Sequence, residues 1–361
     1  MKALISNRSL ATRIFNHASG KSVCGQGGKV KDDVPIPTIS PNEILVKVNT
    51  VALNPTDFKH LDVISPPNSI IGCDYAGLVQ QVGSAVGSGW TPGDRVAGVV
   101  HGGLFPDKGA FAEYLKVDTD LAWKVPAGIS DTDATTYGVS AVTAMLTLNV
   151  RHGLPFIQGD DQAAPKDEAI FIYAGATGAG LFHIQIAKAA GYEVVTTASP
   201  RSFDLVKAYG ATAVFDYRSA TVAADVIKEY PKISKAVDCF SEGKSTSVCA
   251  EVLKNTGGTV VTLLPNGHSN IPGVSYEMVM AYTLFGHPFQ WLPPIGPKFE
   301  AKPADREALV RFYNVLPSIT HILKPIPTVK EKDGFEGILD GLNKLRAGAV
   351  AGGKLVVDFP A

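Results

Sequence analysis

The sequence predicts an α/β protein in which a β-rich unit precedes a doubly wound parallel sheet. Short β-type runs fill the first third of the chain, apolar runs alternate with helix-length segments from residue 169, and a glycine-rich turn follows the first of those runs. Alternation of strands and helices is typical of a parallel sheet. At 361 residues the chain has the length of about two domains.

The β-rich unit is predicted from four runs separated by turn residues. These runs lie at 43–53, 75–83, 94–102 and 111–117. A helix is expected around 132–148, with Asp131 or Thr132 able to cap its start. A polar, proline-containing stretch at 151–168 then separates the two parts of the chain.

The parallel sheet is predicted from five nearly continuous apolar runs, as a sheet covered on both faces requires. The expected strands are 169–174, 193–198, 213–215, 235–240 and 259–264, and the helices between them 178–190, 203–209, 220–229 and 245–254. Two further helices, 304–316 and 334–346, and a closing strand, 354–359, complete the chain.

Composition and charge exclude several classes of function. Lys and Arg number 33 and Asp and Glu 34, a net charge of −1, so nucleic acid and anionic membranes are not expected partners. No segment approaches ~18 uninterrupted apolar residues, and the N-terminus has no leader-like apolar stretch, so we expect a cytoplasmic protein. The four cysteines, Cys24, Cys73, Cys239 and Cys249, form no CxxC pair, which argues against a metal cluster or a disulfide framework.

The glycine-rich turn is the strongest motif, because it joins an expected strand directly to an expected helix. Backbone N–H groups and the helix N-terminus at such a turn bind a pyrophosphate. The residues expected to do so are Gly175, Ala176, Thr177, Gly178 and Ala179. A plain strand-to-helix turn is the alternative. In a GxxGxxG register Leu181 occupies the third glycine position, which predicts looser helix packing or a shifted phosphate contact.

The choice between NADH and NADPH depends on the end of the second strand of this sheet. No carboxylate follows that strand to bind a ribose hydroxyl, whereas Ser199 and Arg201 suit a 2′-phosphate. The expected cofactor is therefore NADPH. Tyr217, after the third strand, is expected to close over the same phosphate or the adenine, or else to be an ordinary surface aromatic residue.

Five segments give the chain a resemblance to a known family. They are GCDYAGLVQQVGSAV (72–86), PGDRVAG (92–98), GAFAEY (109–114), AVTAMLTL (141–148) and GKLVV (353–357). The chain resembles the medium-chain dehydrogenase/reductase superfamily over essentially its full length. This implies a GroES-like catalytic domain, residues 1–136 and 303–361, and a Rossmann NADPH-binding domain, residues 137–302.

The resemblance also points to a member without zinc. In zinc-dependent alcohol dehydrogenases the ligand positions correspond to Asn54 and Cys73 here, and no four-cysteine lobe is present. A lone cysteine cannot bind zinc, because a catalytic site needs three protein ligands. We expect Cys73 to be a small buried residue and no metal to be bound.

Among zinc-free members, other segments resemble the trans-acting enoyl reductases of fungal polyketide biosynthesis, the lovastatin nonaketide type. They are ALNPTDFK (52–59), ASPRSFDLVKAYGA (198–211), VFDYR (214–218) and KAVDCFSEGKST (235–246). The resemblance implies reduction of an enoyl thioester tethered to the acyl carrier protein of a partner polyketide synthase, by a monomeric reductase. The alternatives are a stand-alone quinone or alkenal reductase and a weakly active nucleotide-binding accessory protein, for which Leu181 is the support.

Three residues are candidates for the chemistry. Reduction of an enoyl thioester needs hydrogen-bond donors for the developing enolate oxygen and a proton for the α-carbon. Family analogy places Asn54 and Lys59 at the edge of the cleft, with Lys59 as proton donor or oxyanion stabiliser, or simply a solvated lysine. Thr143 matches the position whose hydroxyl approaches the nicotinamide, or it is a helical threonine bonded to the preceding turn.

The nicotinamide end of the cofactor is expected beyond the strand ends, where ligands of such sheets lie. The backbone groups expected to meet the carboxamide belong to Leu263, Leu264, Pro265, Phe285 and Gly286. Phe285, Phe289 and Trp291 either line an acyl pocket or pack in the core. Each of the eight scattered histidines is expected to be a surface or packed residue, with His60 and His287 the candidate exceptions for a role in catalysis.

Overall fold

The computed structural model describes residues 1–20, 27–159, 163–164, 166–350 and 353–359. The contacts divide the chain into two compact units. Unit 1 comprises Met1–Val139, Tyr282–Pro317 and Pro327–Ala361, and unit 2 comprises Ser140–Ala281 and Ser318–Ile326. The family-based domain limits given above stay a prediction, but residues 282–302, which they assign to the nucleotide-binding domain, pack within unit 1.

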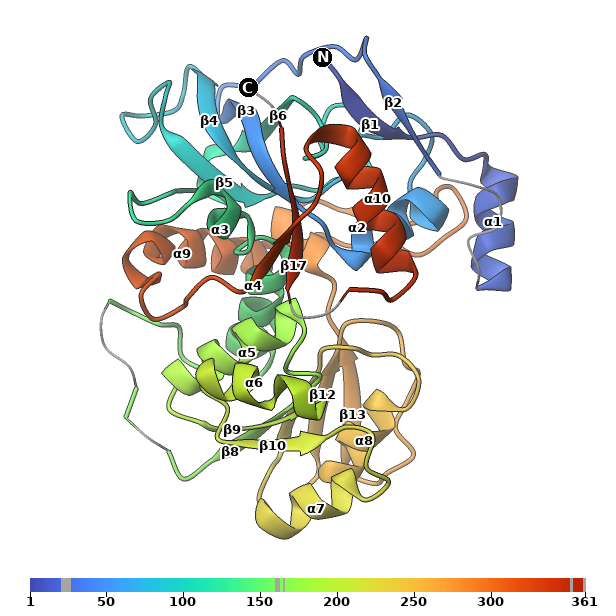
Figure 1. Ribbon diagram of the computed structural model, residues 1–361, viewed down its shortest axis with the longest axis vertical. Coiled ribbons are helices and arrows are strands. Elements are labelled where there is room, and N and C mark those ends of the chain that lie inside the picture. Colours follow the sequence, from blue (N-terminus) through green and yellow to red (C-terminus); the bar gives the residue numbers. More distant parts are fainter. Residues whose placement is uncertain (21–26, 160–162, 165, 351–352, 360–361) are drawn as a thin grey trace. The chain divides into compact units, whose positions relative to one another are not determined.

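Unit 1 is built on a mostly antiparallel sheet of order β16-β17-β3-β4-β5-β7, with β6 also paired to β3. The strands are β3 (Glu43–Ala52), β4 (Asp74–Val82), β5 (Arg95–Val99), β6 (Tyr114–Asp118), β7 (Ala122–Lys124), β16 (Thr328–Lys330) and β17 (Lys354–Asp358). The C-terminal β17, red in Figure 1, pairs antiparallel with the blue β3. Residues some 300 positions apart therefore share one sheet.

Short elements surround this sheet. Two small antiparallel sheets pair β1 (Ala3–Ser6) with β2 (Gly28–Lys31), and β14 (Phe289–Gln290) with β15 (Lys298–Phe299). The helical segments are α1 (Leu10–Ser19), α2 (Pro55–Lys59), the π-helix η1 (His60–Ile64), η2 (Thr119–Leu121), α3 (Asp131–Thr135), η5 (Ala281–Phe285), α9 (Pro303–Ile319) and α10 (Gly334–Arg346). Helix α1 is anchored by buried polar groups, since Arg13 donates to the Ile64 carbonyl and Asn16 to that of Asp62.

The helix expected at 132–148 is broken into α3, α4 (Val139–Met145) and the π-helix η3 (Leu146–Arg151). The break falls at Gly138, where a Cβ would lie 2.1 Å from an Asp74 carboxylate oxygen. The same oxygen accepts a 2.7 Å hydrogen bond from the Val139 N–H. A buried carboxylate thus takes the backbone donor and interrupts the helix, which no local pattern revealed.

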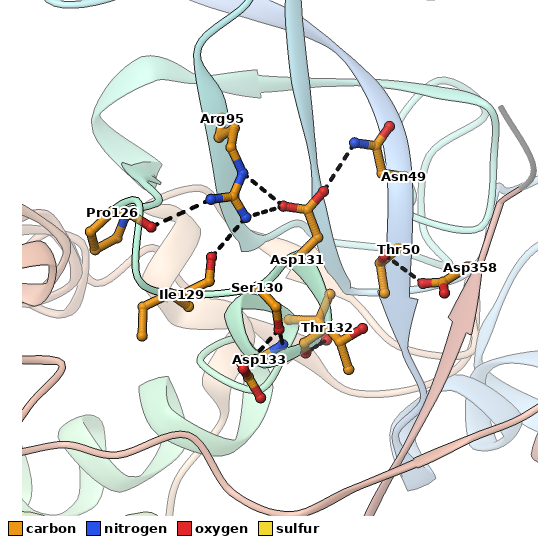
Figure 2. Close-up of polar contacts among 11 residues, drawn as sticks. Asn49, Thr50, Arg95, Pro126, Ile129, Ser130, Asp131, Thr132, Asp133 and Asp358 are labelled. Atoms are coloured by element: carbon orange, nitrogen blue, oxygen red, sulfur yellow. Dashed lines mark hydrogen bonds and ion pairs between the residues drawn. The ribbon is translucent and has the colours of Figure 1, made fainter.

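The first cap of this region also differs from the prediction. Ser130, rather than Asp131 or Thr132, caps α3, with its Oγ accepting from the Asp133 N–H at 3.0 Å. Figure 2 shows why: the Asp131 carboxylate is bound by the Arg95 guanidinium and by the Asn49 amide. The Asp131 side chain therefore ties α3 to β3 and β5 instead of capping the helix.

Unit 2 is a six-stranded, all-parallel sheet of order β10-β9-β8-β11-β12-β13, which confirms the predicted fold class. Its strands are β8 (Ala169–Tyr173), β9 (Glu193–Ala198), β10 (Ala213–Asp216), β11 (Lys235–Asp238), β12 (Gly258–Thr262) and β13 (Val274–Met278). Its helices are α5 (Gly178–Ala189), η4 (Pro200–Ser202), α6 (Phe203–Ala208), α7 (Val222–Glu229) and α8 (Ser245–Val252). Helices α5 and α6 line the same cavity and α7 contacts α8, and all four are labelled in Figure 1.

The strand order places the switch point of unit 2 at β8, which has β9 on one side and β11 on the other. In open parallel sheets, ligands bind at such a point, beyond the carboxyl ends of the strands. The edge strand β13 was not predicted, because only Val274 of its five residues is buried and its sequence VSYEM has no apolar run. The glycine-rich turn follows β8 directly.

Candidate functional site

The turn after β8 is fixed by a small set of hydrogen bonds. Thr177 is the N-cap of α5: its Oγ1 accepts from the Gly180 N–H at 3.0 Å and donates to the Ala174 carbonyl at 2.8 Å. Ala174 adopts a left-handed φ of 62°. The N–H groups of Gly178 and Ala179 fall at the first helical positions, where the helix itself supplies no acceptor. The turn therefore presents donors and a helix N-terminus of the kind that binds phosphate.

The glycines of this turn are required by close approach rather than by φ. A Cβ on Gly180 would lie 2.4 Å from the Ala174 carbonyl oxygen, and one on Gly175 would lie 2.2 Å from Thr196 Oγ1. Gly180 thus provides the tight packing of helix on strand. The loose packing that Leu181 predicted in the GxxGxxG register is wrong, because Leu181 is 2% exposed in the core and Gly180 takes the close-packing role.

The residues predicted for the adenosine end lie at neighbouring strand ends. Ser199 follows β9 with its Oγ 3.3 Å from Ser202 Oγ, Arg201 is exposed in η4, and Tyr217 is 45% exposed just after β10. The Tyr217 N–H reaches the Ala198 carbonyl at 3.4 Å, which links the ends of β9 and β10.

Sequence reasoning missed Arg218 at this edge. Its guanidinium donates two hydrogen bonds, of 3.0 and 2.9 Å, to the Asp216 carboxylate. This pairing lowers the pKa of Asp216, with the hydrogen bond from Arg218 the main cause. The sequence FDYR (215–218), in which an acid is followed two positions later by a cation, was the signal that could have revealed this pair.

The loops after β11 and β12 are fixed by one buried carboxylate. Asp238, wholly buried, accepts from the Ser241 N–H at 2.8 Å and from the Ser245 and Thr246 hydroxyls at 2.6 and 2.7 Å. Ser241 Oγ in turn accepts from the Leu263 N–H at 2.8 Å. The backbone predicted for the nicotinamide end, Leu263, Leu264 and Pro265, is therefore positioned by Asp238, which sequence reasoning missed.

Unit 1 contains a buried polar cluster of Asn54, Asp57, Asp74 and Lys354, here termed the polar core. The Asn54 amide donates to Asp74 at 2.9 Å and accepts from the Lys354 ammonium at 2.7 Å, and its backbone N–H donates to Asp57 at 2.7 Å. Lys354 also lies 2.7 Å from Asp74. All four side chains are at most 6% exposed. Asn54 thus links two carboxylates and one ammonium inside the unit.

Two carboxylates compete for one ammonium in the polar core. Burial, and then the charge of Asp74, raise the pKa of Asp57 to about 7. Burial and the same two carboxylates raise the pKa of the Cys73 thiol, which is 1% exposed. Cys73 is therefore a small buried thiol beside the polar core, as the sequence indicated.

Beside Cys73 lies a cluster of aromatic and imidazole rings. The Tyr282 hydroxyl is 2.8 Å from Thr56 Oγ1 and 3.6 Å from the Cys73 sulfur. His60 Nδ1 donates to the Thr56 carbonyl at 2.9 Å, and burial lowers the pKa of His60 to about 4. The His101 ring stacks on Tyr282 with centroids 4.3 Å apart, and burial lowers its pKa well below the usual value. These imidazoles are neutral near pH 7.

Several residues predicted for the substrate and nicotinamide belong to this ring cluster of unit 1. Phe285 stacks on His101 at 5.3 Å, and His287 does so at 5.4 Å. Phe289 and Trp291 both pack against Phe299. Phe289, which is 6% exposed, therefore packs in the core of unit 1, and the lining of an acyl pocket by these aromatic residues stays a prediction. Gly286, with a φ of 70°, lies next to the Arg306 side chain.

The two remaining chemical candidates lie on separate units. Lys59 ends α2 in unit 1 and is half-buried, so it is not a freely solvated lysine. Thr143 lies in α4 of unit 2 and is 6% exposed. Within the described residues its hydroxyl makes no hydrogen bond to the preceding turn, unlike Thr147, which donates to the Ala144 carbonyl.

Two family models match the chain. One, the alcohol dehydrogenase GroES-like domain, covers residues 40–127, and the other, zinc-binding dehydrogenase, covers residues 178–283. The chain is 37% identical to trans-enoyl reductase resD of Aspergillus sclerotiorum, over 92% of this chain and 97% of that protein. It is 33% identical to trans-enoyl reductase iccB of Talaromyces variabilis, over 94% and 95%.

The chain belongs to the medium-chain dehydrogenase/reductase family. This protein is therefore an oxidoreductase whose relatives include trans-enoyl reductases. Among the residues that the structure describes, no group of three His, Cys, Asp or Glu side chains could hold a metal ion. Cys24 lies outside the described residues. In that same part of the chain, no helix is long and apolar enough to cross a membrane.

Solved structures support the fold of this reductase family member. The quinone oxidoreductase of Pseudomonas syringae pv. tomato matches with a TM-score of 0.73 at 19% identity, over 99% of this chain and all of that one. The Escherichia coli quinone oxidoreductase in complex with NADPH matches with a TM-score of 0.71 at 18% identity, over the same shares. Members of this family use a nicotinamide dinucleotide.

Proposed function

We propose that this protein is an NADPH-dependent enoyl reductase that works in trans with a polyketide synthase. The observation that carries the proposal is the sequence similarity of this chain to several trans-enoyl reductases, at 32–37% identity over about nine-tenths of the chain. Its substrate is an α,β-unsaturated thioester tethered to the acyl carrier protein of that synthase. The reductase acts as a monomer.

The residues of unit 2 fit a phosphorylated dinucleotide. The first turn of α5 offers the N–H groups of Gly178 and Ala179 to the pyrophosphate. A Cβ at Gly175 or Gly180 would clash with neighbouring atoms, so glycine at both positions keeps the turn tight. Ser199, Arg201 and Tyr217 surround the expected 2′-phosphate. When bound, NADPH supplies the hydride for the β-carbon of the enoyl thioester.

The residues of this chain then stabilise and protonate the product of hydride addition. The thioester oxygen gains negative charge as the hydride arrives, and aimed hydrogen-bond donors stabilise it. Lys59 provides such a donor or the proton for the α-carbon, and the Thr143 hydroxyl orients the nicotinamide. The amide of Asn54 is already bound by Asp74 and Lys354, so Asn54 acts through the shape of the polar core or through its second N–H.

A substrate panel tests this proposal. Pantetheine-linked enoyl chains, carrier-bound enoyl chains with the synthase, and free enones are compared with NADPH and with NADH. We expect fast NADPH oxidation with the thioesters and a marked preference over NADH. Saturating NADPH without turnover of any enoyl thioester, even with the synthase present, would sink the proposal.

A second candidate function is a stand-alone quinone or alkenal reductase, favoured by the likeness in fold to quinone oxidoreductases. Rapid turnover of simple quinones without preference for the pantetheine arm would establish it. The close packing at Gly180 argues against one of the two consequences drawn from Leu181, and a calorimetric titration that shows no NADPH binding would favour the weakly active accessory role.

A further inference from the structure

Unit 2 carries a cavity of about 390 Å³ that neither the nucleotide turn nor the proposed reaction uses. Its walls come from the last turns of α5 and α6 and from the segment around residues 321–324. Three lysines line it, Lys188, Lys207 and Lys324, together with His321, and no Asp or Glu is among its lining residues. We call this cavity the basic pocket.

The three lysines of the basic pocket carry uncompensated charge. All three are exposed, and in the described part of the chain none forms an ion pair. Other lysines on the surface of this protein do pair: Lys254 lies 2.5 Å from Glu251, and even the widely exposed Lys232 lies 3.6 Å from Asp167. A chain of net charge −1 thus gathers three unpaired cations around one cavity.

Helix ends account for only part of this arrangement. Lysines in the last turn complement the negative end of a helix dipole, which explains Lys188 in α5 and Lys207 in α6. Lys324 lies in an irregular segment between α9 and β16, so no dipole requires a cation there. Its convergence on the other two lysines is a separate observation.

The irregular segment is held rigidly against unit 2. The Gln185 amide donates to the Lys324 carbonyl at 3.1 Å and accepts from the Lys324 N–H at 2.7 Å. The Tyr209 hydroxyl donates to the Pro325 carbonyl at 2.8 Å. Three hydrogen bonds therefore fix the backbone that carries Lys324, so the basic pocket is built before any ligand arrives.

The basic pocket is separate from the nucleotide turn. Helix α5 begins at that turn with Gly178 and reaches the pocket at Gln185, Lys188 and Ala189. A helix rises ~1.5 Å per residue, so along its axis Gln185 lies roughly 10 Å and Lys188 roughly 15 Å from Gly178. One dinucleotide phosphate at the turn therefore does not occupy the pocket.

We propose that the basic pocket binds a small ligand that carries a phosphate group. Lysine ammonium groups act as point charges that suit the several oxygens of a phosphate, whereas the planar fork of arginine is absent from the lining. At about 390 Å³ the cavity has the size of a small-molecule site. Such a ligand cross-links α5, α6 and the 321–324 segment.

Calorimetric titration of the full chain with inorganic pyrophosphate tests the proposal, with NADPH present at saturation so that the nucleotide turn is filled. The test variant is K188Q/K207Q/K324Q. The matched control is K228Q/K232Q/K244Q, which removes the same charge from other exposed positions of unit 2. A third variant, Tyr209→Phe, keeps the lysines but frees the segment that bears Lys324.

We expect the wild type and the control to bind alike, the pocket variant to lose roughly a hundredfold in affinity, and Tyr209→Phe to lose a few-fold. Equal binding by wild type and pocket variant overturns the proposal, as does no binding up to about 10 mM pyrophosphate. Binding of poly-glutamate but not of pyrophosphate also overturns the proposal and indicates that the basic pocket binds an acidic protein partner. Retained NADPH binding shows that the pocket variant is folded, and failure to reduce enoyl thioesters leaves this test unaffected.

Discussion

The glycine turn of unit 2 and the polar core of unit 1 are both dense, buried and polar, but they are encoded differently. The turn lies within residues 174–181, and its partners are in the neighbouring strand and helix. The polar core joins Asn54 and Asp57 to Asp74 and to Lys354, which is 300 positions from Asn54. A motif read along the chain finds the first kind of site, whereas only pairing of distant strands creates the second.

The largest effect is expected from Lys354→Met, which removes the ammonium from the polar core. Two buried carboxylates and the Asn54 amide then lose their cation, and breaking such a pair costs about 3–5 kcal/mol. Urea unfolding measures this loss. Lys330→Met, which breaks the exposed pairs of Lys330 with Asp333 and Asp358, is the control and should cost far less, because solvent screens those pairs. Equal losses in both variants would show that the polar core is not specially dependent on Lys354.

A pH dependence of stability is expected from Asp57. Its pKa in the folded protein is raised to about 7 from the ordinary 3.8, so the folded state holds a proton that the unfolded state has released. Its contribution to stability is therefore full below about pH 4 and is lost as the pH rises towards 7, with a slope of up to about 1.4 kcal/mol per pH unit.

Asp57→Asn should flatten this part of the profile, because the amide carbonyl still accepts from the Asn54 N–H but has no proton to release. The free energy of unfolding of both proteins, measured from pH 4 to 8, checks the prediction. An unchanged slope in the variant would assign the dependence to another group.

A smaller loss of stability is expected from Gly180→Ala. The added Cβ meets the Ala174 carbonyl oxygen at 2.4 Å, so helix α5 must shift from β8, at about 1–3 kcal/mol and with weaker NADPH binding. Gly128→Ala, where a Cβ meets open space, is the matched control. If both variants unfold and bind NADPH alike, Gly180 does not provide the tight packing.

The smallest effect is expected from Arg201→Ala. If this arginine binds the 2′-phosphate, its loss raises the KM for NADPH about tenfold, or about 1.4 kcal/mol, and leaves the KM for NADH unchanged. Steady-state kinetics with both cofactors measures the difference. Arg218→Ala, which removes a neighbouring guanidinium that is hydrogen-bonded to Asp216, is the comparison variant in the same kinetic measurement. A parallel change in both KM values would deny Arg201 a role in cofactor choice.

Much of unit 2 follows from local pattern. Apolar runs and helix-length segments predicted five of its six strands and the four helices between them, because strands buried on both faces have few polar residues. The exception, β13, lies at an edge and is only partly buried, so the pattern there is weak. The candidate nucleotide turn was found for the same reason, although the register of its glycines was misread at Leu181.

Unit 1 was harder to predict where single buried polar groups redirect the backbone. Asp74 breaks the helix expected at 132–148 by accepting from the Val139 N–H, and Asp131 is drawn from its capping role by Arg95. Tyr282 contacts Thr56 and Cys73 across more than 200 positions. Hydrophobic periodicity contains no information about such contacts, because a buried hydrogen bond depends on which atoms meet.

The sequence by itself determined the class of the protein: a β-rich unit, a parallel sheet, a glycine turn placed for a dinucleotide, and the resemblance to the reductase family. The tertiary structure decided which polar groups meet: the polar core of Asn54, Asp57, Asp74 and Lys354, the role of Gly180, and the basic pocket. The physical reason is range. Backbone preference and periodic burial act over a few residues, whereas charge and close packing act between whichever residues the fold brings within a few ångströms.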